Sequence, residues 1–554
     1  MARHGQTVGQ MIARALADAG VEWAFTVPGE SFLGVLDALP GAGIKVVATR
    51  HEGGASFMAE AIAQLTRRPA AVLGTRAVGA GNMSIGIHTA RQNSTPIVAL
   101  VGQVKREFLG REAFQEVDQV ESFGRLAKWA AEVDDPVMAR ATVNEGLRVM
   151  ASARKGPILF SLPEDVLDLP APRRRTSRTG ESLPEAPSPP DQAMVRDIID
   201  RLRHARRPAI VAGYGVIAAD AVDLLADFST RLAVPVFNAW RRPTAFPNDH
   251  PNYLGMTGYG APDSVLKRLA AADFLLVIGC RLNEVATFDY KVPGQRASWA
   301  HVDLEPRHAH AGLSAPDLPL AADAADFLRA ALKTASGRIS IPKERRSALA
   351  AERAAYMVAT TFDESEEWRG PGIHPGRVIA TLERVLPNDA LLTTDAGNFG
   401  NWHARGFHFG REHGFLGPTS GAMGYGLPAA IAASLAQPGR TVVAMCGDGG
   451  FAMTMNELET AVREGARPVV LVFDNKRYGT IAMHQRNEGR ALVATDLGPI
   501  DFVAVARACG AQGERVARDA EFEPALRDAL AAGRPAVIQL EMDPRWISPD
   551  RFDG

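Results

Sequence analysis

Cysteine is scarce in this sequence of 554 residues, and the scarcity narrows the kinds of site that the chain can carry. The cysteines, Cys280, Cys446 and Cys509, are scattered without a metal-ligand spacing, which excludes a zinc cage and fits a reducing compartment. The sequence also lacks any run of about 18 apolar residues, so we expect no membrane-spanning segment. Its first residues lack the apolar core of a signal peptide, and we therefore expect a cytoplasmic protein.

A strong excess of charge of either sign is absent as well. The formal net charge is -2, which gives no indication of nucleic acid or another polyanion as a partner. The remaining composition, 46% apolar and 22% charged, is that of a globular protein long enough for three or four domains.

Short continuous apolar runs alternate with helical patterns in three regions of the chain. Such runs predict parallel sheets that are covered by helices on both faces. The expected strands are 23–27, 45–49, 70–74 and 96–101 in the first region, 208–212, 234–237, 274–278 and 300–302 in the second, and 390–394, 441–445, 469–473 and 536–540 in the third. The first and third regions alternate alike, although no internal repeat is visible in the sequence.

We therefore predict an α/β protein with three doubly wound parallel-sheet domains. Thr7 is the expected N-cap of the first helix. The predicted order is an N-terminal domain at 1–170, a Pro- and Arg-rich linker at 171–190, a central domain at 191–336, a connecting helix and linker at 337–371, and a C-terminal domain at 372–554.

An aspartate stands between glycines at the end of one predicted strand of the third region. The stretch GDG, residues 447–449, is followed by a helical pattern at 455–464, another strand and then Asn475. A strand-turn-helix-strand connection makes the strands parallel, so Asp448 and Asn475 should lie at the edge where open α/β sheets bind ligands. Their oxygens suit Mg²⁺, and the glycines would let backbone N–H groups approach a phosphate. A glycine-rich turn with an incidental aspartate is the alternative.

This spacing resembles the metal–diphosphate motif of thiamine diphosphate enzymes, in which GDG is followed by an asparagine at about the same distance. Here 25 residues separate Gly449 from Asn475. The resemblance implies that Mg²⁺ is held by the side chains of Asp448 and Asn475 and by the backbone carbonyl of Arg477. Family members often have two consecutive asparagines; here an aspartate precedes Asn475, which keeps the ligand asparagine in place.

Two further stretches are similar to cofactor-binding segments of that family. In SGAMGYGLPAAIAA the resemblance implies that Met423 is wedged between the two rings of thiamine diphosphate and that the Gly421 carbonyl accepts from its amino group; ordinary core packing is the alternative for the methionine. TTDAGNFGNW resembles a second diphosphate loop. The cofactor-binding residues implied are Gly397, Asn398, Phe399, Gly421, Met423, Gly447, Gly449 and Gly450.

The stretch RHEGG places Glu52 directly after a predicted buried strand. In the family a glutamate in such a stretch bonds the cofactor's aminopyrimidine ring and so promotes loss of the thiazolium proton. A carboxyl group in a dry pocket suits this task because burial raises its pKa toward the working pH. The resemblance therefore implies that Glu52 is the catalytic residue, and an acid favoured by the helix dipole is the alternative.

The resemblance extends over nearly the whole chain, through FTVPGESFLGVLDAL, RHEGG, GREAFQEVDQV, LAKW and GAMGYGLP to the metal motif. It is closest to the acetolactate synthase-like branch of 2-oxo acid decarboxylases and carboligases. This implies decarboxylation of a 2-oxo acid, followed by addition of the carbanion or enamine to an acceptor carbonyl compound or by its protonation. It also implies a homodimer or homotetramer in which Glu52 of one subunit meets Asp448 and Asn475 of another.

Several positions depart from the pattern of this branch. GTRAVGAGN, residues 74–82, replaces the usual TSGPGATN, which leaves the shape of the pocket open. RLNEV at 281–285 and GMTGYG at 255–260 match the flavin-contacting runs of acetohydroxyacid synthases only in part, so FAD is disfavoured without being excluded. GYG at 213–215 could face a nucleotide phosphate, but a tight turn explains it better.

Candidate substrate residues are inferred from position alone. Gln115 and Lys128 match residues on the substrate side in synthase relatives, and His484 stands where acetohydroxyacid synthases carry a tryptophan. Gln115 and Lys128 are equally well explained as ordinary surface side chains. His403 and His413 join His484 as candidate acids for protonating an intermediate.

Three other functions stay open. A 2-hydroxyacyl-CoA lyase or oxalyl-CoA decarboxylase-like enzyme would use the same cofactor, but the end MDPRWISPDRFDG is not a basic CoA-binding segment. A catalytically silent cofactor-binding protein is disfavoured because Glu52, Asp448, Asn475 and Met423 are all present. A nicotinamide dehydrogenase is disfavoured because no predicted strand is followed by a full GxGxxG and a ribose-binding acid.

Overall fold

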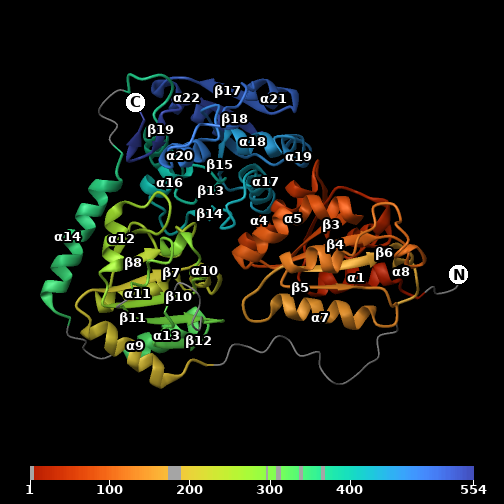
Figure 1. Ribbon diagram of the computed structural model, residues 1–554, viewed down its shortest axis with the longest axis horizontal. Coiled ribbons are helices and arrows are strands. Elements are labelled where there is room, and N and C mark those ends of the chain that lie inside the picture. The colour runs from red at the N-terminus through yellow and green to blue at the C-terminus, as the bar shows by residue number, and fades with distance from the viewer. Residues whose placement is uncertain are drawn as a thin grey trace.

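The computed structural model describes residues 5–171, 189–294, 297–306, 314–335, 341–362 and 368–553. The predicted linker at 171–190 lies almost wholly outside these residues, as do parts of the predicted connecting segment at 337–371. The described chain forms three six-stranded parallel sheets with flanking helices and one antiparallel hairpin, β19 (Trp546–Ser548) and β20 (Arg551–Phe552). The predicted α/β fold class is confirmed, and Figure 1 shows the three units.

The first sheet has the strand order β2-β1-β3-β4-β6-β5. Its strands are β1 (Trp23–Thr26), β2 (Lys45–Ala48), β3 (Ala70–Thr75), β4 (Ile97–Gln103), β5 (Trp129–Glu132) and β6 (Ile158–Pro163). Its α-helices are α1 (Val8–Asp18), α2 (Leu33–Leu36), α3 (Ala38–Gly41), α4 (Glu52–Thr66), α5 (Arg76–Asn93), α6 (Gln119–Phe123), α7 (Ala139–Ala151) and α8 (Glu164–Leu167), with short 3₁₀ turns η1 (Glu30–Phe32), η2 (Arg106–Phe108) and η3 (Gly124–Leu126).

Helix α1 shows how the local sequence sets an element boundary. The Thr7 hydroxyl accepts a hydrogen bond from the Gln10 N–H at 3.2 Å, and the Gln10 side chain accepts one from the Thr7 N–H at 3.1 Å. This capping box satisfies two backbone donors that the first turn leaves without helical partners. The predicted N-cap is therefore confirmed.

The second sheet has the order β12-β11-β10-β7-β8-β9. Its strands are β7 (Pro208–Ala212), β8 (Val236–Asn238), β9 (Tyr253–Met256), β10 (Phe274–Ile278), β11 (Ser298–Asp303) and β12 (Leu318–Ala321). Its helices are α9 (Gln192–His204), α10 (Tyr214–Ala218), α11 (Val222–Leu232), α12 (Asp263–Ala270) and α13 (Ala324–Thr334), with the 3₁₀ turn η4 (Val285–Thr287). The strand order reverses direction between β7 and β10, where such sheets open a crevice.

The third sheet, β14-β13-β15-β16-β18-β17, repeats the topology of the first. Its strands are β13 (Leu391–Thr394), β14 (Gly414–Leu416), β15 (Val442–Gly447), β16 (Val469–Asp474), β17 (Gln512–Val516) and β18 (Ala536–Glu541). Its helices are α15 (Pro375–Val385), α16 (Gly400–Gly406), α17 (Gly426–Ala436), α18 (Asp448–Thr454), α19 (Glu457–Glu464), α20 (Gly479–Asn487), α21 (Phe502–Ala508) and α22 (Asp519–Ala531). The long helix α14 (Lys343–Thr360) follows the second unit in the sequence and lies along its outer side, at the left of Figure 1.

The helical pattern predicted at 455–464 corresponds to α19, which begins at Glu457. A further helix that was not predicted, α18, begins at Asp448, with Gly447 as its N-cap, and ends at Thr454. The glycines after Asp448 therefore lie in the first turn of a helix. The first turn tolerates these glycines because tertiary packing, described below, requires positions without side chains.

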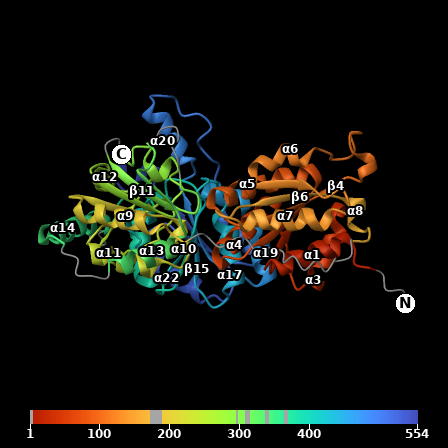
Figure 2. The same ribbon diagram turned by 90° about the horizontal axis from the view of Figure 1, so that it is seen from below.

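The first and third units share one buried interface, formed by α4 and α17 (Figure 1). Helix α17 is rich in alanine and buried on nearly every side, as expected for a helix enclosed by other elements. At its start the Tyr425 ring meets Phe57 of α4 edge-on, with 5.4 Å between ring centroids. In the view from below (Figure 2), the third unit lies between the first and the second.

No helix of the described residues is long and apolar enough to span a bilayer.

Candidate functional site

The predicted metal ligands lie on neighbouring strands. β15 and β16 pair in parallel with Gly447 opposite Phe473, so Asp448 and Asn475 follow adjacent strands at one edge of the third sheet. In this sheet the order of the strands reverses between β13 and β15, so the loops after these two strands border the crevice. Asp395 and Gly397 follow β13, and Asp448 follows β15.

Asp448 is a buried acid at this edge of the sheet. Its carboxylate accepts the Gly449 N–H at 2.8 Å, and the backbone N–H groups of Lys476 and Arg477 lie near enough to lower its pKa. Burial raises the pKa of Asp448 to about 7, and the neighbouring Asp474 adds to the rise, while the N–H groups oppose it. A divalent cation beside this carboxylate would favour its charged form, so the surroundings fit a metal ligand.

The other two predicted ligands keep free acceptor capacity. The Asn475 side-chain oxygen accepts the Arg477 N–H at 3.1 Å, and the Arg477 carbonyl accepts the Gly479 N–H at 2.9 Å. Each such oxygen has two lone pairs, so one remains for a metal. Among the described residues there is no group of three or more His, Cys, Asp or Glu placed to hold a metal. A site of one carboxylate with neutral oxygens and a phosphate therefore fits Mg²⁺ better than a metal held entirely by the protein.

The Phe399 ring packs against both predicted diphosphate loops. A side chain at Gly397 would lie 2.8 Å from its ring, and one at Gly447 would lie 3.1 Å from it. The ring stacks on Phe473 of β16, with 5.4 Å between centroids. Beside it the Asn398 amide oxygen accepts from the Thr480 hydroxyl at 2.9 Å, which ties this loop to α20.

Gly449 and Gly450 are needed for packing within the protein. A side chain at Gly449 would lie 2.5 Å from the Tyr478 ring, and one at Gly450 would meet Oδ2 of Asp395, whose Cγ would be 3.1 Å away. The absence of side chains thus lets the diphosphate loop close onto Tyr478 and Asp395.

Gly450→Ala should lower the free energy of unfolding by about 1–3 kcal/mol, because the added methyl overlaps a carboxylate that is itself held by backbone hydrogen bonds. Denaturant unfolding of the cofactor-free protein measures this change. Gly439→Ala is the matched control, since its methyl would meet no atom within 4 Å. Equal unfolding midpoints for the two variants would contradict the packing assigned to Gly450.

The turn before α17 carries the predicted wedge residue. Met423 is partly buried there, and Gly421 and Gly424 have positive φ values of 72° and 81°. A side chain at Gly421 would meet nothing within 4 Å, so this side of the turn is open. Asp395 holds the end of the turn, because its Oδ1 accepts the Tyr425 N–H at 2.6 Å and the Gly426 N–H at 3.2 Å.

Glu52 is the first residue of α4 and is half-buried. Its Oε2 accepts a hydrogen bond from the Asn82 amide of α5 at 2.9 Å. The preceding backbone is fixed by Glu457 of α19, whose carboxylate accepts the Arg50 and His51 N–H groups at 3.1 and 3.0 Å. No hydrogen bond among the described residues joins Glu52 to the predicted metal ligands.

The candidate substrate residues have different surroundings. The Lys128 ammonium donates to the Ser152 carbonyl at 2.6 Å and the Arg154 carbonyl at 2.9 Å, and burial lowers its pKa. These contacts suit a structural lysine. Gln115 has a positive φ of 62° and a buried side-chain oxygen with no protein partner, which leaves an acceptor for a ligand. His484 is exposed on α20.

Burial keeps the other two candidate histidines neutral. It lowers the pKa of His403 to about 3 and also lowers the pKa of His413. Neither histidine is therefore a ready proton donor near neutral pH.

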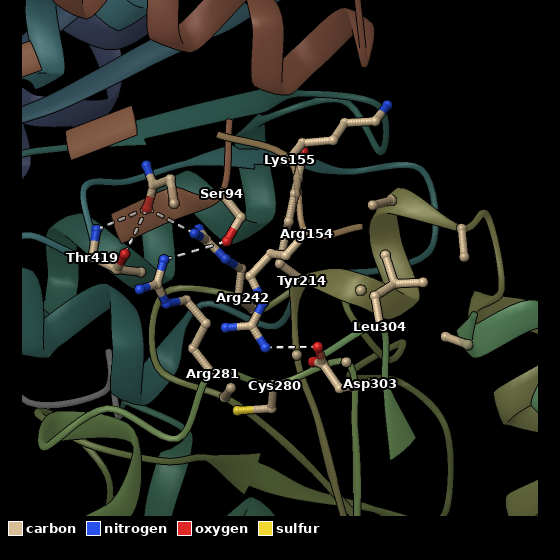
Figure 3. Close-up of a pocket in the computed structure, with 18 of the residues that line it drawn as sticks. Ser94, Arg154, Lys155, Tyr214, Arg242, Cys280, Arg281, Asp303, Leu304 and Thr419 are labelled. Atoms are coloured by element: carbon tan, nitrogen blue, oxygen red, sulfur yellow. Dashed lines mark hydrogen bonds and ion pairs between the residues drawn. The ribbon is translucent and has the colours of Figure 1, made fainter. Parts of the chain in front are cut away.

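A cavity of about 600 Å³ lies between the first and second units, at the β7–β10 crevice (Figure 3). Two of its cationic side chains are engaged with the protein: Arg154 pairs with Asp303 at 2.6 Å, and Arg281 donates to backbone carbonyls near the end of α5. A side chain at Gly215 would lie 2.6 Å from the Gly279 Cα, so the GYG stretch, which was predicted to form a tight turn, is the close-packed start of α10. The expectation that FAD is disfavoured stays a prediction.

Asp395, Asn82 and Arg241 belong to the surroundings of the site but were not predicted. Asp395 stands directly after a predicted strand, in the quoted stretch TTDAGN, so position could have indicated it. Asn82 is the last residue of GTRAVGAGN, the stretch that differs from the usual TSGPGATN of the family. Nothing local indicates Arg241, which comes from the second unit.

Comparison with known proteins agrees with this arrangement. Three domain profiles match the chain: "Thiamine pyrophosphate enzyme, N-terminal TPP binding domain" over residues 6–122, the "central domain" over 195–331, and the "C-terminal TPP binding domain" over 395–540. A probable acetolactate synthase large subunit of Methanocaldococcus jannaschii is 29% identical, over 98% of this chain and 92% of that protein. A sulfoacetaldehyde acetyltransferase of Rhodobacter capsulatus is 30% identical, over 99% and 96%. Acetolactate synthase isozyme 2 large subunit of Escherichia coli is 28% identical, over 96% and 95%.

Proposed function

The chain belongs to the thiamine pyrophosphate enzyme family, in its acetolactate synthase-like branch, and from this premise we propose that it decarboxylates a 2-oxo acid. The remaining fragment then goes to an acceptor carbonyl compound or takes up a proton. The observation that supports this most is the meeting of Asp448, Asn475 and the Arg477 carbonyl at one sheet edge, next to the loop of Phe399.

In this proposal the chain's residues bind and orient the cofactor. Asp448, Asn475 and the Arg477 carbonyl would hold Mg²⁺ on the diphosphate. Bound thiamine diphosphate supplies an electron sink for the carbon that loses carbon dioxide. Glu52 would hold a proton at the aminopyrimidine ring, and the Asn82 amide orients its carboxylate.

We further propose a homodimer or homotetramer in which each site takes Glu52 from one subunit and the metal ligands from another. Support comes from large apolar side chains that are exposed near both halves: Val78 at 49% and Ile85 at 42% on α5, and Met453 and Ile481, each at 51%, beside the predicted metal site. A second subunit would cover such surfaces.

Acetyl transfer from a sulfonated aldehyde is a second candidate function, because the sulfoacetaldehyde acetyltransferase is 30% identical over nearly the full length of both chains. It differs from the first in the donor, which would lose its sulfonate group as sulfite, with no release of carbon dioxide, and so reach the acetyl level without an oxidant.

A panel of 2-oxo acids, each alone and paired with aldehydes or other oxo acids, tests the first function, and sulfoacetaldehyde with phosphate, assayed for sulfite, tests the second. We expect carbon dioxide release that depends on added thiamine diphosphate and Mg²⁺, and a coupled product with at least one acceptor. Carbon dioxide release without any coupled product would indicate a decarboxylase. No release from any 2-oxo acid would contradict the proposed reaction.

A further inference from the structure

Arg241 of the second unit reaches into the third unit at the base of the predicted cofactor site. It follows β8, is only 7% exposed, and has a φ of 58°, which is unusual for a residue other than glycine. Its Nη2 donates to the backbone carbonyl of Asp395 at 2.8 Å, whereas its Nε and Nη1 are buried without protein partners. A strained, buried arginine persists only where its surroundings hold it firmly.

Arg241 contacts Asp395 through the backbone carbonyl of that residue, and its guanidinium charge acts on the buried Asp395 side chain. This side chain is fully buried; burial raises its pKa to about 7, and the backbone N–H groups of residues 424–426 and the Arg241 guanidinium oppose the rise. Arg241 has its own pKa lowered by burial to about 10, which leaves it a cation near neutral pH. Arg241 therefore favours the charged form of Asp395, against the effect of burial.

Other ionisable groups around Asp395 do not supply this charge. Burial lowers the pKa of His403 to about 3 and raises that of the Cys446 thiol, so both are neutral near pH 7. The adjacent Arg242 turns away: its guanidinium donates to the Asn93 side chain at 2.8 Å and lies over the Tyr214 ring at 5.1 Å. Of these two arginines, Arg241 is the one whose guanidinium donates to Asp395.

Asp395 joins two parts of the cofactor site. Its Oδ1 accepts the Tyr425 and Gly426 N–H groups, which end the turn carrying Gly421 and Met423. Its Oδ2 has no protein partner and lies against Gly450 of the diphosphate loop. A protonated or displaced Asp395 would be a poorer acceptor for these N–H groups and would loosen the turn.

We propose that Arg241 is a positioning residue of the cofactor site, which fixes Asp395, and through Asp395 the Met423 turn, against the diphosphate loop by its hydrogen bond to the Asp395 carbonyl and by its charge. The inference rests on the proposed binding of thiamine diphosphate and adds to it a residue from the second unit. Removing the charge of Arg241 should then weaken cofactor binding, although Arg241 lies outside the predicted motifs.

Calorimetric titration of thiamine diphosphate with Mg²⁺ into the cofactor-free, full-length protein tests this. Arg241→Met should raise Kd by about tenfold or more, the loss typical for partners that orient a bound group. Arg241→Lys keeps the charge and should lose less. Arg242→Met is the matched control, because it removes a neighbouring buried arginine that does not face Asp395, and its Kd should stay within about threefold of the unchanged protein.

A double variant separates the charge from simple packing. In Arg241→Met with Asp395→Asn, both charges are gone while an amide oxygen can still accept the Tyr425 N–H. We expect the Kd of the double variant to lie closer to that of the unchanged protein than the Kd of Arg241→Met does. Independent sites do not show such a coupling. Additive losses in the two single variants would overturn the proposal.

The outcomes distinguish this inference from the proposed function. If the unchanged protein fails to bind thiamine diphosphate, the proposed function fails. If it binds and Arg241→Met binds as tightly as Arg242→Met, the role of Arg241 is refuted while the function stands. Should Arg241→Met not fold, Arg241→Gln replaces it, since glutamine keeps a donor for the Asp395 carbonyl without the charge; unchanged binding by that variant also refutes the role.

Discussion

Glu52→Gln should lower turnover by about 10²–10⁴-fold while leaving the affinity for thiamine diphosphate close to that of the unchanged protein. Glutamine has nearly the same shape and can still accept from the Asn82 amide, whose nitrogen lies 2.9 Å from the Glu52 carboxylate. It cannot share a proton with the aminopyrimidine ring. The loss should therefore appear in the chemical step, and steady-state turnover together with calorimetric binding measures both quantities.

The control for this variant is Glu344→Gln, the same chemical change at an exposed position near the start of α14. It should change neither turnover nor binding. Undiminished turnover in Glu52→Gln would remove Glu52 from the mechanism. Loss of cofactor binding with no separate loss of turnover at saturation would instead make it a binding residue.

The sequence indicated well that Asp448 and Asn475 follow neighbouring strands, because this geometry is encoded locally. A strand that ends in GDG, a helix and a second strand that ends before Asn475 leave little freedom, since such connections make the strands parallel. β15 and β16 are indeed neighbours, with Gly447 opposite Phe473. Most of the strands that were not predicted are edge strands of their sheets: β5, β9, β12, β14 and β17. Edge strands are less enclosed and need not be continuous apolar runs; β6, an interior strand, is the exception.

The pairing of Arg241 with Asp395 could not be predicted in the same way. The two residues are 154 positions apart and belong to different units. In the sequence, Arg241 and Arg242 are two consecutive basic residues after Trp240. Such residues could equally lie on a surface, because arginine is rarely buried unless it is paired. Only the packing of the second unit against the third makes Arg241 an interior charge. The glycines of the GDG stretch were predicted for their access to phosphate, but their contacts with Phe399, Tyr478 and Asp395 depend on the same tertiary packing.

Asp448→Ala should abolish most Mg²⁺-dependent retention of the cofactor, with an affinity loss of more than about 100-fold. That exceeds the loss expected when only an outer partner of a ligand is removed. Asp448 is the only acidic side chain in the predicted ligand set of Asp448, Asn475 and the Arg477 carbonyl. Asp448→Asn keeps an oxygen ligand without the charge and should fall between the alanine variant and the unchanged protein. Cofactor content after desalting in the presence and absence of Mg²⁺ measures the retention.

Asp496→Ala is the control, because Asp496 is exposed near the same loop and pairs with the Arg477 side chain at 2.7 Å. Its loss should leave retention unchanged, since the Arg477 carbonyl, not its guanidinium, is the predicted ligand. Full retention by Asp448→Ala would refute the metal assignment. Equal losses in Asp448→Ala and Asp496→Ala would point to a general disturbance of the loop. A loss confined to Asp448 that grows as Mg²⁺ is lowered is therefore the specific result expected, because a missing ligand weakens the metal and, through it, the diphosphate.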